Sequence, residues 1–347
     1  MASEQSLVLG TEPLGFPWVT EDPFLFCAHH LDKYPAGDAE MGVQADLTGR
    51  QMGSDFSGRN GFSMYHGLHV PGFPQHPHRG FETVTIARSG WIDHSDSLGA
   101  TARFSAGDVQ WITAGGGIVH SEMFPLRDES GPNPTELFQI WLNLPRRSKM
   151  VPAHFKMFWS EQVPRLSVGE DGSGGSITVI SGHPAGGTAL EPPPHSWAAE
   201  PNTGVEILVI HLEQGASWTL QPAAEGARRN FYFFSGASLA CSAPGGEPML
   251  VSGRTRISVR PDLPCTLRAV GGPADVLVLG GRPIGEPVVA HGPFVMNSVA
   301  EIQQAFHDYR RTQFGGWPWK SDGPVHERAR GRFAVHADGA LDQPKVP

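Results

Sequence analysis

The chain has 347 residues, of which 26 are basic and 35 are acidic, and its net charge of −9 argues against nonspecific binding to nucleic acid. Its 43 glycines and 31 prolines exceed the usual share but lie between apolar runs, which is typical of a turn-rich all-β protein rather than a disordered one. No run of about 18 apolar residues occurs, and the N-terminal residues contain no long apolar stretch, so we expect no membrane-spanning helix, no signal peptide and a cytoplasmic location.

The first half of the chain is a series of short apolar and β-branched segments that end at turn residues. Residues 81–87 are rich in β-branched and aromatic side chains, and residues 109–113 alternate between apolar and polar side chains, as half-buried strands do. Residues 91–96 and 137–142 are further strand-like segments of similar length. Short strands repeated at spacings of about 8–12 residues predict a β-sandwich or a β-barrel.

Two histidines lie two positions apart in the segment His76-Pro77-His78. In an extended chain, residues i and i+2 point to the same face, so both imidazoles are able to bind one metal ion. Pro77 favours the extended conformation because it disfavours helical backbone angles at His76. Chance occurrence is the alternative, since the chain contains 16 histidines.

A second pair of potential ligands, His120 and Glu122, has the same spacing and follows a run of glycines, residues 115–117, that allows close backbone approach. Two such pairs on neighbouring strands would supply three nitrogens and one carboxylate oxygen, which suits a divalent first-row metal such as iron, manganese, nickel or copper. The chain has three cysteines, which are widely spaced and distant in sequence from both pairs: Cys27, Cys241 and Cys265. They predict neither a thiolate metal site nor a disulfide framework.

Residues 145–165 contain scattered prolines and little periodicity, and we interpret them as a connection between two lobes. Strand-like segments then resume at residues 177–180, 205–212, 230–234 and 274–279. We therefore predict two β-lobes of similar architecture. The N-terminal lobe, with the metal site, is expected over residues 1–150, and the C-terminal lobe, without one, over residues 151–290.

The last part of the chain, residues 291–347, is predicted to contain a short helix and a polar tail. Ser298 and Glu301 have the spacing of a capping box at the start of a helix. The apolar residues that follow recur at helical spacing: Val299, Ile302, Phe306 and Tyr309. We expect the arginines of the tail to be solvated rather than to form a binding patch: Arg328, Arg330 and Arg332.

Three long sequence blocks resemble those of the pirin family, within the cupin superfamily: residues 76–85, 107–123 and 285–297. The resemblance implies an all-β bicupin with two cupin-type β-barrel or jelly-roll lobes, a short C-terminal helix and one metal site. By position, it assigns four metal ligands in the first lobe: His76, His78, His120 and Glu122. The family's metal is usually iron, so Fe(II) is the expected cofactor, with manganese, nickel, copper or zinc as alternatives. Glu82 lies where many other cupins place a ligand, and we assign it a supporting or structural role.

Other histidines carry weaker signals. His211 and Glu213 have the i, i+2 spacing but lack a partner pair, so we interpret them as the end of a strand. A further group is expected either to lie at the mouth of the site or to be ordinary surface residues, and is assigned no role: His66, His69, Asp93 and His94.

The resemblance implies two candidate functions. The first is the cleavage of quercetin-type flavonols with O2, in which the 3-hydroxy-4-keto group binds the metal and Glu122 is a catalytic base as well as a ligand. The second is a non-catalytic, redox-sensing iron protein that binds a transcription factor or a metabolic enzyme. We place the enzyme first, with a small aromatic substrate and no direct contact with nucleic acid or membrane. A bicupin with an unrelated small substrate is the third alternative.

Overall fold

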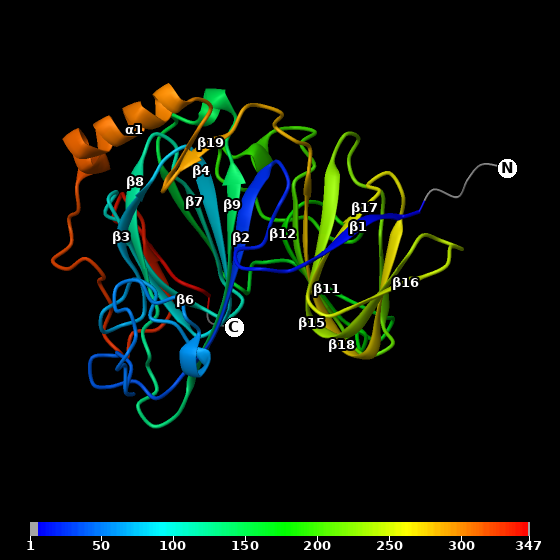
Figure 1. Ribbon diagram of the computed structural model, residues 1–347, viewed down its shortest axis with the longest axis horizontal. Helices are drawn as coiled ribbons and strands as arrows, with labels where there is room; N and C mark the ends of the chain where they lie inside the picture. Colours follow the sequence, from blue (N-terminus) through cyan, green and yellow to red (C-terminus); the bar gives the residue numbers. More distant parts are fainter. Residues whose placement is uncertain (1–5, 346–347) are drawn as a thin grey trace. The chain divides into compact units, whose positions relative to one another are not determined.

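The computed structural model describes residues 6–345, which form two compact units. The N-terminal lobe contains Cys27–Glu161 and the residues from Glu286 onward, and the C-terminal lobe contains the residues up to Phe26 and Gln162–Gly285. Both lobes are built from β-strands, and α1 (Val299–Thr312) is the one α-helix among the described residues (Figure 1). The predicted all-β fold with a short C-terminal helix is confirmed. Within residues 6–345, no helix is long and apolar enough to cross a membrane.

The division into lobes differs from the predicted one near both ends of the chain. β1 (Val8–Pro13) pairs with β17 (Thr255–Val259), and the ring of Trp18 stacks on Tyr232 at a centroid distance of 5.5 Å, so the N-terminal segment belongs to the C-terminal lobe. Residues after Gly285 return to the N-terminal lobe. Sequence periodicity identifies strands but not the sheet edge that each one joins. The predicted lobe boundaries at residues 150 and 290 therefore assign the N-terminal segment to the wrong lobe and leave the residues after 290 outside the N-terminal lobe.

The C-terminal lobe contains an antiparallel sheet of nine strands in which β1, β17, β15, β18, β13, β12 and β11 are successive neighbours. β14 pairs with β18, and β16 pairs with β15. The remaining strands are β11 (Arg165–Ser167), β12 (Gly175–Ser181), β13 (Glu206–Leu212), β14 (Ser217–Leu220), β15 (Arg228–Ser242), β16 (Met249–Ser252) and β18 (Cys265–Gly281). Cys241 and Cys265 lie in its apolar core, and burial raises the pKa of the Cys265 thiol to about 12. All three cysteines of the chain are buried and free.

The N-terminal lobe contains two sheets that face each other (Figure 1). One sheet contains β10 (His154–Phe158), β7 (Val109–Thr113), β4 (Phe81–Ser89), β9 (Asn133–Asn143) and β2 (Phe24–Tyr34) in that order. The other contains β22 (Leu341–Asp342), β21 (Phe333–Val335), β6 (Thr101–Ser105), β5 (Trp91–Asp96), β8 (Ile118–Met123) and β3 (Gly72–His78). A separate hairpin is formed by β19 (Val289–His291) and β20 (Phe294–Met296).

The N-terminal lobe buries both an apolar core and a set of polar side chains. Ile92 and Leu137 belong to the core. His78, His120 and Glu122, from β3 and β8, are buried in the same lobe. Burying polar side chains costs free energy unless they find partners, so this group marks the candidate site.

The C-terminal tail packs against the six-stranded sheet instead of extending into solvent. β21 extends the sheet beyond β6, and near the opposite edge Gln75 donates hydrogen bonds to Asp322 from its backbone N–H and its side-chain amide, both at 2.7 Å. Arg328 donates to backbone carbonyls of the lobe, and Arg332 binds carboxylates of the lobe. The prediction of a solvated tail is therefore wrong, because a polar composition does not reveal fixed hydrogen-bond acceptors on a neighbouring surface.

Beneath this tail lies a fully buried ion pair between Arg103 of β6 and Asp93 of β5. Two parallel hydrogen bonds of 2.6 and 2.7 Å join the guanidinium to the carboxylate. The other donors of the guanidinium reach backbone carbonyls of the tail, at His326, Glu327 and Arg330. The pair therefore ties the tail to the sheet and leaves neither charge uncompensated.

α1 begins as the sequence predicts. The Ser298 hydroxyl accepts a hydrogen bond from the backbone N–H of Glu301, whose carboxylate accepts one from the backbone of Asn297. Ile302 and the small residue Ala305 are buried against the β19–β20 hairpin. Val299, which the periodicity places in the same stripe, is 61% exposed, so the buried face is narrower than predicted.

We expect Ser298→Ala to lower the free energy of unfolding by about 1 kcal/mol, because one N–H at the start of α1 loses its acceptor. Urea denaturation of the wild type and the variant measures this difference. Ser298→Asp, which retains an acceptor and adds a favourable charge at the helix start, is the control and should lose much less. Equal losses in the two variants would contradict the capping role.

Candidate metal centre

Three of the four predicted ligands converge on one point between adjacent strands. β3 and β8 are antiparallel neighbours, and His76 lies opposite His120 in their register. The Nε2 atoms of these two residues are 3.1 Å apart. Together with His78, each offers a ring nitrogen, and the three nitrogens lie within 4.8 Å of one another. Within residues 6–345 this is the one group of three such side chains that is close enough to share a metal ion.

The surroundings keep these imidazoles neutral and orient one of them. The Nδ1 of His76 lies 2.9 Å from the Pro74 carbonyl, which can only accept, so Nδ1 carries the proton and Nε2 presents a lone pair. Burial lowers the pKa of His76 to about 4 and holds the pKa values of His78 and His120 well below the ordinary value. Neutral imidazole is the form that binds metals.

The polar atoms that lack partners also fit a metal ion. Both ring nitrogens of His78 and Nδ1 of His120 are buried without a hydrogen bond of good geometry, although the Pro293 carbonyl lies near the His78 ring. His78 packs instead against Phe81 and Trp141, with ring centroids 5.0 and 5.3 Å away. Buried nitrogens without partners are costly, and a cation held by three imidazoles would compensate this cost.

Glu122 lies beside the three histidines, but its carboxylate is held by the opposite sheet. Thr85 of β4 donates to Oε1 at 3.1 Å, and Gln139 of β9 donates to Oε2 at 2.5 Å. Burial raises the pKa of Glu122, against the opposing effects of His94 and of these two hydrogen bonds. Its oxygens are not among the ligand atoms that lie within 4.8 Å of one another, so its place as fourth ligand stays a prediction.

We expect Gln139→Met to weaken metal binding by about tenfold, because partners of this kind orient the ligands of a metal site. Titration of the metal-free protein with Mn(II), followed by calorimetry, measures the affinity. Gln110→Met is the matched control: Gln110 is a glutamine that also lies opposite Thr85, but its amide faces Met157. Equal affinities in the two variants would contradict the role of Gln139.

A fourth histidine lies next to the site, where the sequence suggested a surface or mouth residue. His94 of β5 is opposite Glu122 in the strand register, and its ring centroid is 5.6 Å from that of His120. Its Nε2 lies 3.0 Å from Asp96, which also accepts two backbone N–H groups of the following turn. His94 and its neighbour Asp93 are fully buried, so the expectation of exposure is wrong for both.

The other candidates are outside the three-histidine group. Glu82 is fully buried and accepts a hydrogen bond of 2.6 Å from Thr113, which agrees with a structural role. His66 is exposed and close enough to His76 to influence its pKa, whereas exposed His69 lies beside Asp38 and Glu40. In the other lobe, His211 is the penultimate residue of β13 and lies next to Glu213 and Asp275.

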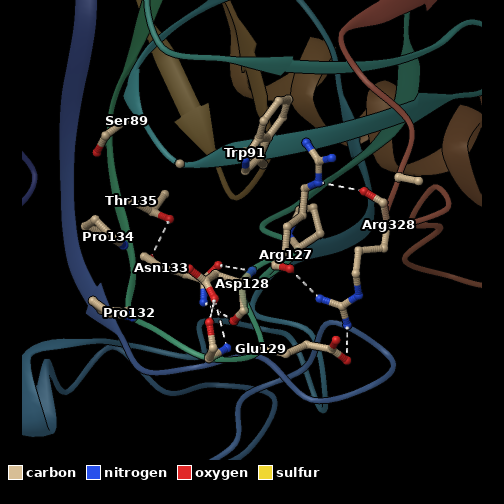
Figure 2. A pocket seen from close by; sticks show the side chains of 14 residues that line it. Ser89, Trp91, Arg127, Asp128, Glu129, Pro132, Asn133, Pro134, Thr135 and Arg328 are labelled. Atoms are coloured by element: carbon tan, nitrogen blue, oxygen red, sulfur yellow. Dashed lines mark hydrogen bonds and ion pairs between the residues drawn. The ribbon is translucent and has the colours of Figure 1, made fainter.

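A separate hollow of about 910 Å³ in the same lobe contains none of these residues. Figure 2 shows the two arginines that line it, Arg127 and Arg328. Arg127 lies over the ring of Trp91 at 4.0 Å, and each arginine donates a hydrogen bond to the other's backbone carbonyl. These side chains hold the tail to the lobe, and the hollow is distinct from the metal centre.

Sequence reasoning missed the partners of Glu122. Thr85 and Gln139 are opposite each other on β4 and β9, so both side chains point to the same face of their sheet. Gln139 is the polar residue in an otherwise apolar run, residues 137–142, and a polar residue in a buried strand is a signal that was available. The sequence gives no signal for the pairing of β4 with β9, which brings Thr85 and Gln139 together at Glu122.

Comparison with known proteins identifies the family of the chain. Residues 21–142 match the family model described as Pirin, and residues 207–315 match the model described as Pirin C-terminal cupin domain. A Pseudomonas aeruginosa protein with the provisional name quercetin 2,3-dioxygenase is 38% identical over 70% of this chain and 80% of its own length. The chain belongs to the pirin family of the cupin superfamily. It is a bicupin with an all-β fold.

Other pirin-family proteins and a solved structure are also similar. Pirin of Rattus norvegicus is 34% identical over 75% of this chain and 84% of its own length. The crystal structure of quercetin 2,3-dioxygenase from Acinetobacter baumannii covers 90% of this chain and 99% of that chain, with 27% identity and a TM-score of 0.69. Names of pirins and of dioxygenases thus both occur among its relatives.

Proposed function

We propose that this pirin-family protein is a mononuclear non-haem iron dioxygenase that cleaves quercetin-type flavonols with O2. The observation that carries the proposal is the convergence of His76, His78 and His120 on one point, beside the buried carboxylate of Glu122. The similarity to proteins named quercetin 2,3-dioxygenase supports the choice of substrate. Fe(II) is the proposed metal, held by the three imidazoles and by Glu122 as fourth ligand.

Each residue of the site has a separate role in the proposed reaction. A divalent metal would supply Lewis acidity toward the 3-hydroxy-4-keto group of a flavonol. Glu122 accepts the proton of the 3-hydroxyl group, and burial favours this because it raises the pKa of the carboxylate toward that of the proton donor. Thr85 and Gln139 hold the carboxylate in place during the transfer. Phe81 and Trp141, stacked at 4.0 Å, form an apolar wall behind His78.

The test is an aerobic assay with purified, metal-loaded protein. Quercetin and related flavonols are added, and the loss of flavonol absorbance is recorded together with oxygen consumption. The chelated protein should be inactive, and addition of Fe(II), Mn(II), Ni(II), Cu(II) or Zn(II) should identify the metal that restores activity. Oxygen consumption without flavonol loss, or activity that survives complete removal of metal, would reject the proposal.

A second candidate function is an iron-dependent regulator that binds a transcription factor or a metabolic enzyme. The observation that favours it is that His76 is partly exposed whereas His78 and His120 are buried, so a metal ion held by the three would lie close to the surface. A change in the charge of the metal would then alter the surface that a partner contacts. A defined partner that binds the metal-loaded wild type but not the metal-free His78→Ala variant, without flavonol turnover, would favour this function.

A further inference from the structure

We infer that the loop between β2 and β3 recognises the aromatic ring that the substrate carries beyond its metal-binding group, through Phe56 and His66. The loop, residues 35–71, is called the rim loop below. This inference takes the class of substrate from the proposed function. It adds that the rim loop selects among substrates of this class. It follows from the rigidity of the rim loop, from its position and from the chemistry of its exposed side chains.

The rim loop is long and has almost no regular structure. It contains a single short 3₁₀ turn, η1 (Arg59–Gly61), and no named strand. Loops longer than about 12–15 residues without secondary structure are uncommon in compact domains and are usually functional or disordered. Disorder does not describe this loop, because buried side chains fix its conformation at several points. A functional role is the remaining explanation.

Two carboxylates hold the rim loop. Asp55 forms an ion pair of 2.6 Å with Arg50, both side chains are 1% exposed, and Asp55 also accepts the backbone N–H of Met64. Asp32 of β2 accepts the backbone N–H of Ser63 and the hydroxyl of Tyr65, both at 2.8 Å. These contacts fix the backbone next to Phe56 and next to His66, so the surface that these two residues present is formed before any ligand binds.

Tyr65 has a backbone φ of +56°, which is an unfavourable conformation for a residue with an aromatic side chain. Strain of this kind persists where the surrounding contacts impose it, and it is frequent at ligand-binding positions. Here the hydrogen bond to Asp32 and the stacking of the Tyr65 ring on Phe73, at 5.0 Å, impose it. The following residue, His66, is thereby directed to the surface, where it is exposed.

A continuous set of aromatic rings leads from the metal site to the rim loop. The ring centroid of Phe73 is 6.3 Å from that of the ligand His76, and His66 is 5.7 Å from Phe73. Phe56 follows, with its centroid 5.2 Å from that of His66, and its side chain is 46% exposed. His76 is the one histidine of the three that is partly exposed, and the row of rings begins at it.

The exposed groups match a planar aromatic ring with hydroxyl substituents. The Nδ1 of His66 lies 2.7 Å from the Gly53 carbonyl and so carries the proton, which leaves Nε2 as an acceptor without a partner among the described residues. The rings of Phe56 and His66 are inclined at 74° to each other, and Phe56 is 46% exposed, so part of its apolar ring is open to solvent. A phenolic ring would pack on Phe56 and donate a hydrogen bond to His66 Nε2.

Two probes separate recognition of this ring from binding to the metal. 3-Hydroxyflavone carries a phenyl ring, and 3-hydroxychromone has the same 3-hydroxy-4-keto group without that ring. Both are titrated into the metal-loaded protein under anaerobic conditions, and the dissociation constants are measured by fluorescence, so no turnover is required. We expect Phe56→Ala to weaken binding of 3-hydroxyflavone by about tenfold, since an aromatic contact of this kind contributes that much. Binding of 3-hydroxychromone should change by less than about twofold.

His66→Ala is expected to weaken binding of quercetin, which has hydroxyl groups on its phenyl ring, more than binding of 3-hydroxyflavone, which has none. Phe56→Tyr retains the ring and should retain the wild-type affinity. Leu341→Ala, which removes a side chain of similar exposure (60%) from β22 of the same lobe, is the control and should change neither affinity. Metal content of every variant is measured first.

The outcomes distinguish this inference from the proposed function. Wild-type protein that binds both probes, with the two affinities unchanged in Phe56→Ala, would overturn the role of the rim loop and leave the proposed function intact. Weakening of both probes to the same degree would also overturn it, because the effect would then lie at the metal. Wild-type protein that binds neither probe would overturn the proposed function and the inference with it.

Discussion

Glu122→Gln is expected to lower the rate of O2-dependent flavonol cleavage by about 10²–10⁴-fold, which is the contribution that a positioned general base makes. The amide has the same size and still lies between Thr85 and Gln139, but it cannot accept the proton of the substrate hydroxyl. The initial rate of flavonol absorbance loss, with oxygen consumption, measures the effect. Burial destabilises the ionised form of Glu122 and so raises its pKa. Since only the ionised carboxylate can accept the substrate proton, the wild-type rate should fall on acidification, as Glu122 becomes protonated.

The comparison requires variants with equal metal content. Glu129→Gln is the matched control, since Glu129 is an exposed glutamate of the same lobe that lies in the separate hollow. It should retain the wild-type rate. A metal-saturated Glu122→Gln protein with unchanged turnover would contradict the role of Glu122 as base, whatever its contribution to metal binding.

Arg103→Met is expected to lower the free energy of unfolding by about 3–5 kcal/mol, because it leaves the Asp93 carboxylate buried without its partner. The same change removes the donors that hold backbone carbonyls at His326, Glu327 and Arg330, so the tail should also loosen. Urea denaturation measures the loss of stability. Limited proteolysis, read by mass spectrometry, should show new cleavage between residues 316 and 332.

Arg260→Met provides the comparison for an exposed pair. Arg260 also makes two hydrogen bonds to a single carboxylate, Asp262, but that partner is 61% exposed, so solvent screens the pair and the loss of stability should be much smaller than for Arg103→Met. If the two variants lost the same free energy of unfolding, the buried pair would contribute no more to stability than the exposed pair does. Unchanged proteolysis of Arg103→Met would separately contradict the coupling between the pair and the tail.

The sequence was sufficient for features that depend on local chemistry. The i, i+2 spacing of His76 and His78 in an extended segment correctly placed both rings on one face, and the structure brings His120 to the same point. The capping box at Ser298 correctly gave the start of the helix. In each case a few consecutive residues determine the backbone geometry, so no knowledge of distant segments is needed.

Features that depend on long-range pairing were not predictable. The partners of Glu122 come from a different sheet, and His94 is buried because β5 lies next to β8, which residues 91–96 do not indicate. The tail has a polar composition that suits solvent, yet its arginines meet acceptors supplied by loops far away in the sequence. Which strand forms a sheet edge, and what covers that edge, are properties of the whole fold.

The contact between Gln75 and Asp322 affects where the chain can be shortened. The match to the second family model ends at residue 315, which suggests a natural stopping point for a truncated protein. Such a protein would lose Asp322, and strand β3 would then present unpaired backbone groups next to His76. An uncovered edge of this kind favours pairing with a second molecule, so truncation at the family boundary should promote self-association. It should also disturb His76, a proposed metal ligand more than 230 residues earlier in the chain.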